Sequence, residues 1–261
     1  MPLPLPQLSL SEVCRRIEVF IREKLEEADA TGVIVGLSGG VDSSTAASLC
    51  ARALGPEKVL GLIIPDKRVT PREDVEDAKL IAERLGIEYK IIEISPICDA
   101  ITSLFPNKGN HTVEGNVKAR VRMVLLYHEA NRLKRLVVGS GDRSELLIGY
   151  YTKYGDGGAD LLPLGGLFKT QVRELAKFLG VPQKIATKPS SPRLWAGHTV
   201  EAELGMSYDV IDPILHGLVD LGMTEQKIAK ELGIPLDMIK KIRRMIKNTE
   251  HKRRMPLVAE I

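Results

Sequence analysis

A run of small and hydroxyl-bearing residues, Ser38-Gly39-Gly40-Val41-Asp42-Ser43, has the residue types and spacing of a phosphate-binding turn. It follows a short apolar run and precedes a helical pattern. Glycines let the backbone turn tightly and direct successive N–H groups at an anion, and the start of a helix adds the positive end of its dipole. The serine hydroxyls supply further donors. We therefore predict that this turn cradles a phosphate group.

Asp42 needs a separate explanation, because a carboxylate beside a phosphate repels it. A Mg²⁺ ion between the two would replace this repulsion by bridging, since Mg²⁺ prefers oxygen ligands and commonly shares them with substrate phosphates. Asp42 is therefore predicted to bind a metal ion. The simpler alternative is a capped strand-to-helix turn, in which Asp42 and Ser43 only satisfy free backbone amides.

A serine hydrolase is a different alternative, because Gly36-Leu37-Ser38-Gly39-Gly40 also satisfies the GxSxG pattern of a nucleophile elbow. The five histidines, at 111, 128, 198, 216 and 251, stand in no obvious triad order, and no HGGG-type oxyanion sequence is present. A hydrolase would also leave Asp42 unexplained. The phosphate turn is therefore the preferred interpretation.

The chain around this turn alternates between strand and helix patterns. Apolar runs rich in β-branched residues predict strands at 32–38, 59–65, 89–94 and 135–141. Helical spacing predicts an opening helix that begins with a Ser9–Glu12 capping box and ends near Asp29, and further helices at 43–54, 72–85 and about 114–134. This alternation predicts an α/β fold, a doubly wound, Rossmann-like parallel sheet with ligands at the carboxyl ends of its strands.

In the second half of the chain, the alternation of strand and helix patterns gives way to a glycine-rich stretch and then to helical patterns. A glycine-rich stretch at 150–166 is too long and too polar for an ordinary connection, and such loops are often functional. Helical patterns follow at 168–179, about 207–221, 224–232 and 235–248. We predict a single domain over residues 1–261, with an α/β nucleotide-binding core at about 1–180 and a helical C-terminal extension at about 181–261.

The composition excludes several classes of protein. With 44% hydrophobic and 27% charged residues the chain can bury a sizeable core, and its formal net charge of +3 creates no global field that would demand a nucleic-acid or membrane partner. Neither a basic leader nor an apolar run of about 18 residues is present, so no signal peptide or membrane span is expected. Three separated cysteines suit a reducing compartment. A cytoplasmic location is predicted.

The C-terminal part leaves a third alternative. Residues 224–239 read as a helix-turn-helix with its turn at Gly233, and eight Lys or Arg follow between 240 and 254. This pattern is compatible with a nucleic-acid-binding module. A basic amphipathic helix is more often a solvated face, so nucleic-acid binding is the less favoured interpretation.

The turn SGGVDS after a first buried strand resembles the pyrophosphate loop of the ATP pyrophosphatase superfamily, whose fold is adenine-nucleotide α-hydrolase-like. That superfamily also includes GMP synthetase, asparagine synthetase and tRNA-thiolating enzymes, so the loop alone leaves the substrate open. Further segments follow in a fixed order: GNVKARVRM (115–123), GSGDRSE (139–145), TKYGDGGADLLPLGGLFKTQV (152–172), KPSSP (188–192) and His251-Lys252. Together they resemble NAD synthetase, from Gly36 to Lys252.

This resemblance implies a reaction. The carboxylate of deamido-NAD would be adenylated by ATP with Mg²⁺ as cofactor, and ammonia would displace AMP to give NAD. It also implies a homodimer, with no membrane or nucleic-acid partner. The chain length leaves no room for a glutaminase domain, so free ammonia is the expected nitrogen source. Another ATP pyrophosphatase activity, GMP synthetase-like or tRNA-thiolating, is the alternative.

The resemblance also implies roles for individual residues. ATP would be bound by Gly36, Leu37, Ser38, Gly39, Gly40, Val41, Asp42, Ser43, Ser140, Lys169 and Ser191. Deamido-NAD would be bound by Arg120, Lys153, Asp160, His251 and Lys252. Asp42 and Glu145 would share Mg²⁺, and Ser38, Asp42 and Lys169 would be catalytic. For Asp160, the alternative role is to order the glycine-rich loop.

Overall fold

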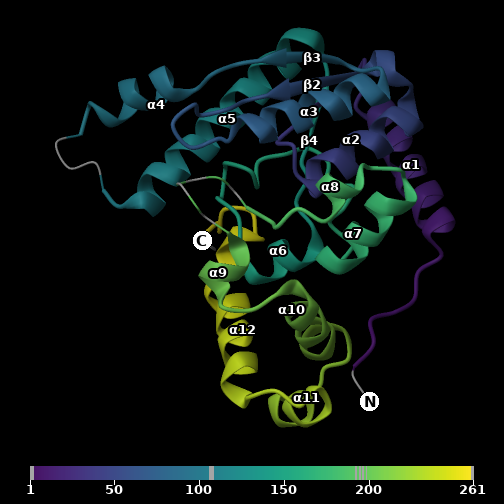
Figure 1. The fold of residues 1–261 in the computed structure, drawn as a ribbon, viewed down its shortest axis with the longest axis vertical. Coiled ribbons are helices and arrows are strands. Elements are labelled where there is room, and N and C mark those ends of the chain that lie inside the picture. Colours follow the sequence, from purple (N-terminus) through teal and green to yellow (C-terminus); the bar gives the residue numbers. More distant parts are fainter. Residues whose placement is uncertain are drawn as a thin grey trace.

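The computed structural model describes residues 3–105, 109–191, 193, 195, 197 and 199–259, and a four-stranded parallel sheet lies in its upper part (Figure 1). The strands are β1 (Val33–Gly36), β2 (Val59–Ile63), β3 (Glu88–Ile91) and β4 (Leu136–Val138), in the order β3-β2-β1-β4. All four predicted strands are present, each shorter than its apolar run. The order reverses between β1 and β4, and such a reversal opens a ligand crevice at the carboxyl ends of the strands.

Both faces of the sheet are covered, because successive residues of a strand point to opposite sides. Val33 and Val35 of β1 belong to a core formed with four helices, whereas Ile34 packs on the other face with two more. The first set is α1 (Leu10–Glu27), α2 (Val41–Leu54), α3 (Arg72–Leu85) and α7 (Lys169–Phe178), and the second is α4 (Ser95–Thr102) and α5 (His111–Leu133). The predicted doubly wound α/β fold is therefore confirmed.

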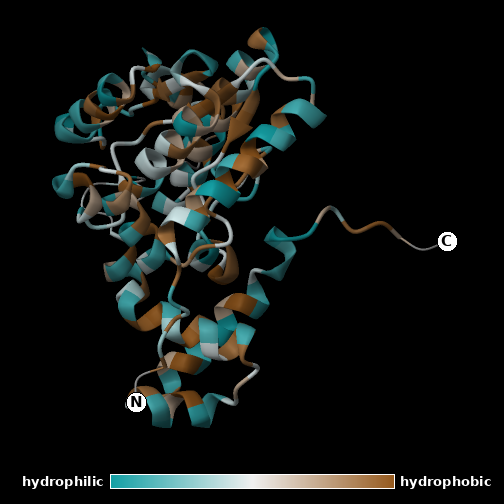
Figure 2. Ribbon diagram, turned by 90° about the vertical axis from the view of Figure 1, so that its right-hand side faces the viewer, coloured by the Kyte–Doolittle hydropathy of each residue, from teal (hydrophilic) through white to brown (hydrophobic). Residues whose placement is uncertain are grey.

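The C-terminal helices form a separate apolar cluster below the sheet (Figure 1). They are α9 (Val200–Leu204), α10 (Tyr208–Leu215), α11 (Glu225–Leu232) and α12 (Leu236–Asn248), and α10 continues as a π-helical turn over His216–Asp220. Along these helices hydrophobic and hydrophilic residues alternate, in the lower part of Figure 2. Ile148 and Phe168 join the same cluster, so the extension is packed against the part of the chain that leads into α7.

Four helices lie where the sequence predicted none. They are α4, α6 (Arg143–Ile148), α8 (Gln183–Ala186) and α9, with 8, 6, 4 and 5 residues. Helices α6, α8 and α9 are shorter than two helical turns, which is too short for an apolar period to repeat. Short 3-10 turns also occur at Pro56–Lys58 and Glu250–Lys252.

The capping box predicted at Ser9 and Glu12 is wrong. The Ser9 hydroxyl pairs with that of Ser11 (3.2 Å), and Glu12 forms an ion pair with Arg15 (2.7 Å) instead of returning to the backbone. A capping box with side-chain bonds in both directions exists at the start of α6, where Asp142 and Glu145 supply it. Within the described ranges no helix is long and apolar enough to cross a membrane.

Candidate active site

The turn at 38–43 joins β1 to α2 at the crevice of the sheet. Gly39 has a φ of 75°, and a Cβ there would lie 2.1 Å from the carbonyl oxygen of Asp74, so the position requires glycine. The Ser38 hydroxyl lies 3.0 Å from Ser43 Oγ and accepts a hydrogen bond from the Gly40 N–H (3.3 Å). The turn is therefore held in place by its own serines directly before the N-terminus of α2.

A cavity of about 480 Å³ opens beside this turn, within the size range of small-molecule sites. Residues that follow β1 and residues that follow β4 both line it, as the reversed strand order predicts. The predicted site residues that line the cavity are Gly36, Leu37, Ser38, Gly40, Val41, Asp42, Ser140, Glu145, Ser191 and Lys252. The structure thus brings predicted site residues from after β1 and from after β4 together at one cavity.

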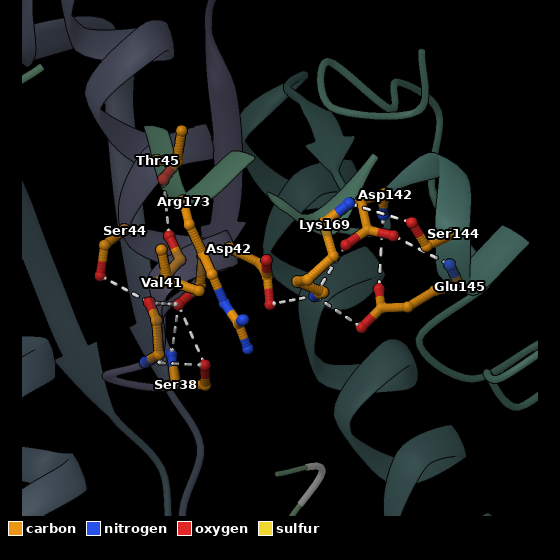
Figure 3. Close-up of polar contacts among 12 residues, drawn as sticks. Ser38, Val41, Asp42, Ser44, Thr45, Asp142, Ser144, Glu145, Lys169 and Arg173 are labelled. Atoms are coloured by element: carbon orange, nitrogen blue, oxygen red, sulfur yellow. Dashed lines mark hydrogen bonds and ion pairs between the residues drawn. The ribbon is translucent and has the colours of Figure 1, made fainter. Parts of the chain in front are cut away.

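Lys169 is fully buried next to the cavity, and its ammonium group is surrounded by three carboxylates (Figure 3). Its Nζ lies 2.8 Å from Asp42 Oδ2, 2.7 Å from Asp142 Oδ2 and 2.9 Å from Glu145 Oε1. These four residues are hereafter the Lys169 cluster. One positive charge faces three negative charges, so the cluster carries two formal negative charges in excess.

Helix termini fix the geometry of the Lys169 cluster. Asp142 is the N-cap of α6, and its Oδ1 accepts the Glu145 N–H at 2.8 Å. Lys169 begins α7, and its N–H donates to Ser144 Oγ (2.9 Å), whose hydroxyl donates to Asp212 Oδ1 (2.6 Å). Because the charged groups stand on helix starts that are themselves hydrogen-bonded, they are held where they meet.

Burial and mutual repulsion shift the protonation of this cluster. Burial raises the pKa of Asp142 and of Glu145, and the neighbouring carboxylates raise both further against the attraction of Lys169. Burial alone would lower the pKa of Lys169, but the three carboxylates hold it well above its ordinary value. The ammonium group therefore stays charged, and the surplus negative charge favours an additional cation.

The donors at the cavity suit Mg²⁺ bound in part by substrate. Within the described chain no group of three or more His, Cys, Asp or Glu could hold a metal ion by itself. Asp42 and Glu145 nevertheless both line the cavity, and Asp42 Oδ1 is buried with no hydrogen-bond partner among the described residues. Mg²⁺ is typically held by one or two carboxylates plus substrate phosphates, not by an all-protein cage. The two carboxylates fit that mode of binding.

Some predicted residues lie outside the cavity lining. Arg120 donates from Nη2 to the Lys153 carbonyl oxygen (3.3 Å), and Lys153 Nζ donates to the His251 carbonyl oxygen (2.7 Å). These three residues are thus linked to one another, and none of them lines the cavity. Lys169 also points at carboxylates and does not line it. The contacts predicted for these four residues with deamido-NAD or ATP stay predictions.

Asp160 has both carboxylate oxygens engaged within the protein. Oδ1 accepts the Tyr127 hydroxyl at 2.9 Å, and Oδ2 accepts the Val137 N–H at 2.7 Å. These bonds fasten the end of the glycine-rich loop to α5 and to β4, which is the geometry that the loop-ordering alternative requires. A contact of Asp160 with deamido-NAD stays a prediction.

A second ion cluster, which no sequence pattern indicated, lies beside the cavity. Lys188 Nζ lies 2.9 Å from Asp74 Oδ1 and 2.5 Å from Asp77 Oδ2, both on α3. Lys184 pairs with Asp77 (2.5 Å) and Arg193 with Asp74 (2.7 Å). These five residues are hereafter the Asp74–Asp77 cluster, with three cations against two carboxylates. No spacing in the sequence links α3 to a segment more than a hundred residues later, so only the fold reveals the cluster.

The contacts of Ser38 do not form a hydrolytic triad. Its hydroxyl meets Ser43 and the Gly40 N–H, and none of the histidines that the structure describes bonds to it. Of the five, His198 lies outside the described residues. The two helices of the helix-turn-helix alternative, α11 and α12, do form with a turn at Gly233, and an ion pair between Glu225 and Arg243 (2.6 Å) joins them.

The sheet is parallel, a glycine-serine turn lies at its switch point, and a carboxylate cluster that shares Asp42 with this turn lies beside the cavity. These features define a class, the nucleotide-binding α/β proteins. Comparison with known proteins narrows this class. The model of the NAD synthase family matches residues 13–256. The chain is 53% identical over 249 residues to the NH(3)-dependent NAD(+) synthetase of Hyperthermus butylicus, which covers 95% of this chain and 90% of that protein.

Solved structures agree with this match. The NH3-dependent NAD synthetase from Campylobacter jejuni subsp. jejuni superposes with a TM-score of 0.83 at 32% identity, over 97% of this chain and 100% of that chain. The NMN synthetase from Francisella tularensis superposes with a TM-score of 0.85 at 34% identity, over 98% and 100%. The chain therefore belongs to the NAD synthase family, and it is an enzyme, a ligase of NAD biosynthesis.

Proposed function

We propose that this chain is an ammonia-dependent NAD synthetase, which uses ATP to convert the nicotinate carboxylate of deamido-NAD into the amide of NAD. The observation that carries the proposal is the meeting of the phosphate turn and the Lys169 cluster at one cavity, in a chain of the NAD synthase family. A carboxylate is a poor acceptor for ammonia until one of its oxygens becomes a leaving group. Adenylation supplies that leaving group.

In the first step a carboxylate oxygen of deamido-NAD attacks the α-phosphorus of ATP. The bond from that phosphorus to the bridging oxygen breaks, and pyrophosphate leaves. We expect the turn at 38–43 and the start of α2 to receive it. Catalysis of this step consists mainly of positioning and charge stabilisation, as in other phosphoryl transfers.

In the second step the ammonia nitrogen attacks the carboxyl carbon of the acyl-adenylate. The bond from that carbon to the AMP oxygen breaks, and the nitrogen loses a proton. The acyl-adenylate reacts readily with water, so the two steps must share one enclosed site. A single cavity reached from both β1 and β4 meets this requirement.

The Lys169 cluster, which shares Asp42 with the turn at 38–43, would act on the phosphates beside that turn. Asp42 and Glu145 would hold Mg²⁺, which would supply positive charge to offset the negative charge of the ATP phosphates. Lys169 fixes the direction of both carboxylates through ion pairs of 2.8 and 2.9 Å. Asp142 in turn holds Lys169 through the third ion pair.

The test is a turnover assay in which each component is omitted in turn. We expect release of pyrophosphate and AMP to depend on deamido-NAD and Mg²⁺, and NAD to form only with ammonium. Chelation of Mg²⁺ with EDTA should abolish turnover, and excess Mg²⁺ should restore it. Release with another acceptor would keep ATP pyrophosphatase chemistry and discard this substrate, whereas no ATP turnover with any acceptor would overturn the proposal.

The likeness to the NMN synthetase gives a second candidate substrate, nicotinic acid mononucleotide. The 53% identity to a relative named NAD synthetase, against 34% to the NMN synthetase, favours the dinucleotide. Parallel assays with both substrates decide between them through their ratio of kcat/KM. Equal or higher kcat/KM with the mononucleotide would reverse the assignment.

Three further properties belong to the proposal. The enzyme acts as a homodimer in the cytoplasm on free ammonia, without a membrane or nucleic-acid partner. The α/β core and the C-terminal extension work as one functional unit, which the shared packing of Ile148 and Phe168 with the C-terminal helices supports. Sedimentation of the purified protein tests the dimer, and a monomer at assay concentrations would contradict it.

A further inference from the structure

Helix α5 presents one side of its segment 112–126 to the cavity. Residues at helical spacing along it line the cavity, namely Thr112, Asn116, Ala119, Met123 and Leu126. Arg122 lines it as well. Arg120 is only two positions earlier, and because each residue turns a helix by about 100°, the two arginines point to different sides. Arg120 is exposed and bonds to Lys153, so Arg122 is the arginine of the pair that faces the cavity.

The guanidinium of Arg122 is only partly committed to the protein. Its Nε donates to the carbonyl oxygen of Ile64 at 3.0 Å, where the chain leaves β2. Throughout the described ranges, no carboxylate forms an ion pair with Arg122, and no acceptor bonds to its two terminal nitrogens. Two nitrogens of a planar fork therefore remain available to a ligand.

The nearest acids are already engaged elsewhere. Asp66 is fully buried and binds Arg68 (3.0 Å) and Lys118 (2.9 Å), and it accepts a hydrogen bond from the Ser95 hydroxyl (2.7 Å). Asp156 accepts the Thr152 N–H at 2.8 Å. Neither acid therefore neutralises Arg122 by direct contact.

The surroundings of Arg122 leave its charge poorly compensated. Loss of hydration lowers the pKa of Arg122, and this effect outweighs the attraction of Asp66 and Asp156. The neighbouring wall is apolar, with Leu62, Ile64 and Leu126. A desolvated cation without a counterion gains free energy when an anion reaches it, and a guanidinium is suited to two oxygens of a phosphate or carboxylate.

From these observations we infer that Arg122 is a further substrate-binding residue of this enzyme, which holds two oxygens of an anionic group. The inference rests on the proposed function. Two sources supply that chemistry, the triphosphate of ATP and the carboxylate or pyrophosphate of deamido-NAD. Arg122 and the phosphate turn would then bind anions from opposite faces of the sheet, since α5 and α2 cover different faces.

The binding test uses the full-length protein and two variants of one helix. Arg122→Met removes the charge and keeps much of the bulk, and Arg132→Met is the matched control, since Arg132 is exposed on α5 and pairs only with Glu129 among the described residues. Calorimetry gives the Kd of ATP in the presence of Mg²⁺ and of deamido-NAD separately. We expect Arg122→Met to weaken one of them by about 10- to 100-fold, as for a charged hydrogen bond, and the control to change neither.

Arg122→Lys and chemical labelling of the unmodified enzyme keep the role of Arg122 testable if Arg122→Met misfolds. Arg122→Lys keeps the charge but lacks the fork, so we expect it to recover part of the lost affinity. In the unmodified enzyme, phenylglyoxal should label Arg122, and the ligand that it binds should slow this labelling, whereas Arg132 should react equally with or without ligand. Mass spectrometry of the peptides reports both sites.

The outcomes distinguish an error in the proposed function from an error in the role of Arg122. If the wild-type protein binds neither ATP nor deamido-NAD, the proposed function is wrong. If it binds both, while Arg122→Met binds both as tightly and neither ligand protects Arg122 from labelling, only the role of Arg122 is wrong. Loss of ATP affinity identifies the triphosphate as the anion, and loss of deamido-NAD affinity identifies the dinucleotide.

Discussion

Two ion clusters stand beside the same cavity with opposite charge balance. The Lys169 cluster has one ammonium among three carboxylates, and the Asp74–Asp77 cluster has three cations on two carboxylates. Ion pairs buried in a protein gain little over apolar packing, because the loss of hydration offsets the attraction between the charges. The first cluster has a surplus of formal negative charge beside the cavity, and the second has a surplus of formal positive charge.

The two clusters also differ in what they fix. Residues of the Lys169 cluster stand at the starts of α2, α6 and α7, where helix geometry sets their direction. The Asp74–Asp77 cluster ties the segment around Lys188 to α3 and to the turn, since Lys188 Nζ also approaches the Gly39 carbonyl oxygen (3.5 Å). The first cluster therefore positions charged side chains at the cavity, and the second positions the backbone around Lys188.

Removal of Lys169 should have the largest effect. Lys169→Met leaves three carboxylates buried without their cation, and the loss of one partner of a buried pair commonly costs about 3–5 kcal/mol. We expect urea unfolding at pH 8 to show a loss of that size together with loss of NAD formation. A stability change under about 1 kcal/mol would mean that the carboxylates are not held by Lys169.

The next largest effect concerns chemistry alone. Asp42→Asn removes one of the excess negative charges, so stability should not fall, whereas NAD formation should drop by at least about 100-fold if Asp42 stabilises charge in the transition state. Steady-state kinetics and thermal melting measure the two effects. Asp237→Asn, an exposed position in the first turn of α12, is the control. Loss of stability in step with activity would show that Asp42 is mainly structural.

The second cluster should respond more mildly and with a pH dependence. Burial would raise the pKa of Asp77, but Lys184 and Lys188 lower it below its ordinary value of 3.8. A carboxylate of this kind stabilises the fold fully above its ordinary pKa, and the contribution is lost as the pH falls through the lowered value. Asp77→Asn should therefore cost about 1–3 kcal/mol at pH 7 and progressively less in acid below pH 4.

Urea unfolding of the wild type and Asp77→Asn at pH 7 and pH 3 measures this convergence. A constant difference between the two proteins at both pH values would contradict the ion-pair explanation.

The smallest effect should come from an ion pair outside both clusters. Arg243 on α12 is half exposed and pairs with Glu225 of α11 at 2.6 Å. Exposed pairs contribute about 0–1 kcal/mol, so Arg243→Gln should change the free energy of unfolding by less than about 1 kcal/mol and leave NAD formation unaltered. An effect as large as that of Asp77→Asn would remove the contrast between buried and surface pairs.

Local sequence patterns were sufficient to predict much of this architecture. The buried runs predicted all four strands, and the glycine-serine turn predicted the place of the cavity, because both depend on neighbouring residues. The direction of a helical side chain depends on what the helix packs against. For that reason the sequence did not show that Arg122 faces the cavity while Arg120 does not, nor that Asp142 lies fully buried against Lys169. The Asp74–Asp77 cluster joins segments far apart in the chain and left no local pattern.

The pairing of β1 with β4 has a consequence for how the protein is made. Residues 37–135 separate the two strands, and Lys169 follows later still. As the chain emerges from the ribosome, β1, β2 and β3 can associate early, but β1 keeps an open edge until β4 arrives. Pairing across so long a separation is slow. A nascent chain halted before residue 136 would therefore have three strands, an exposed edge prone to aggregation, and no catalytic site.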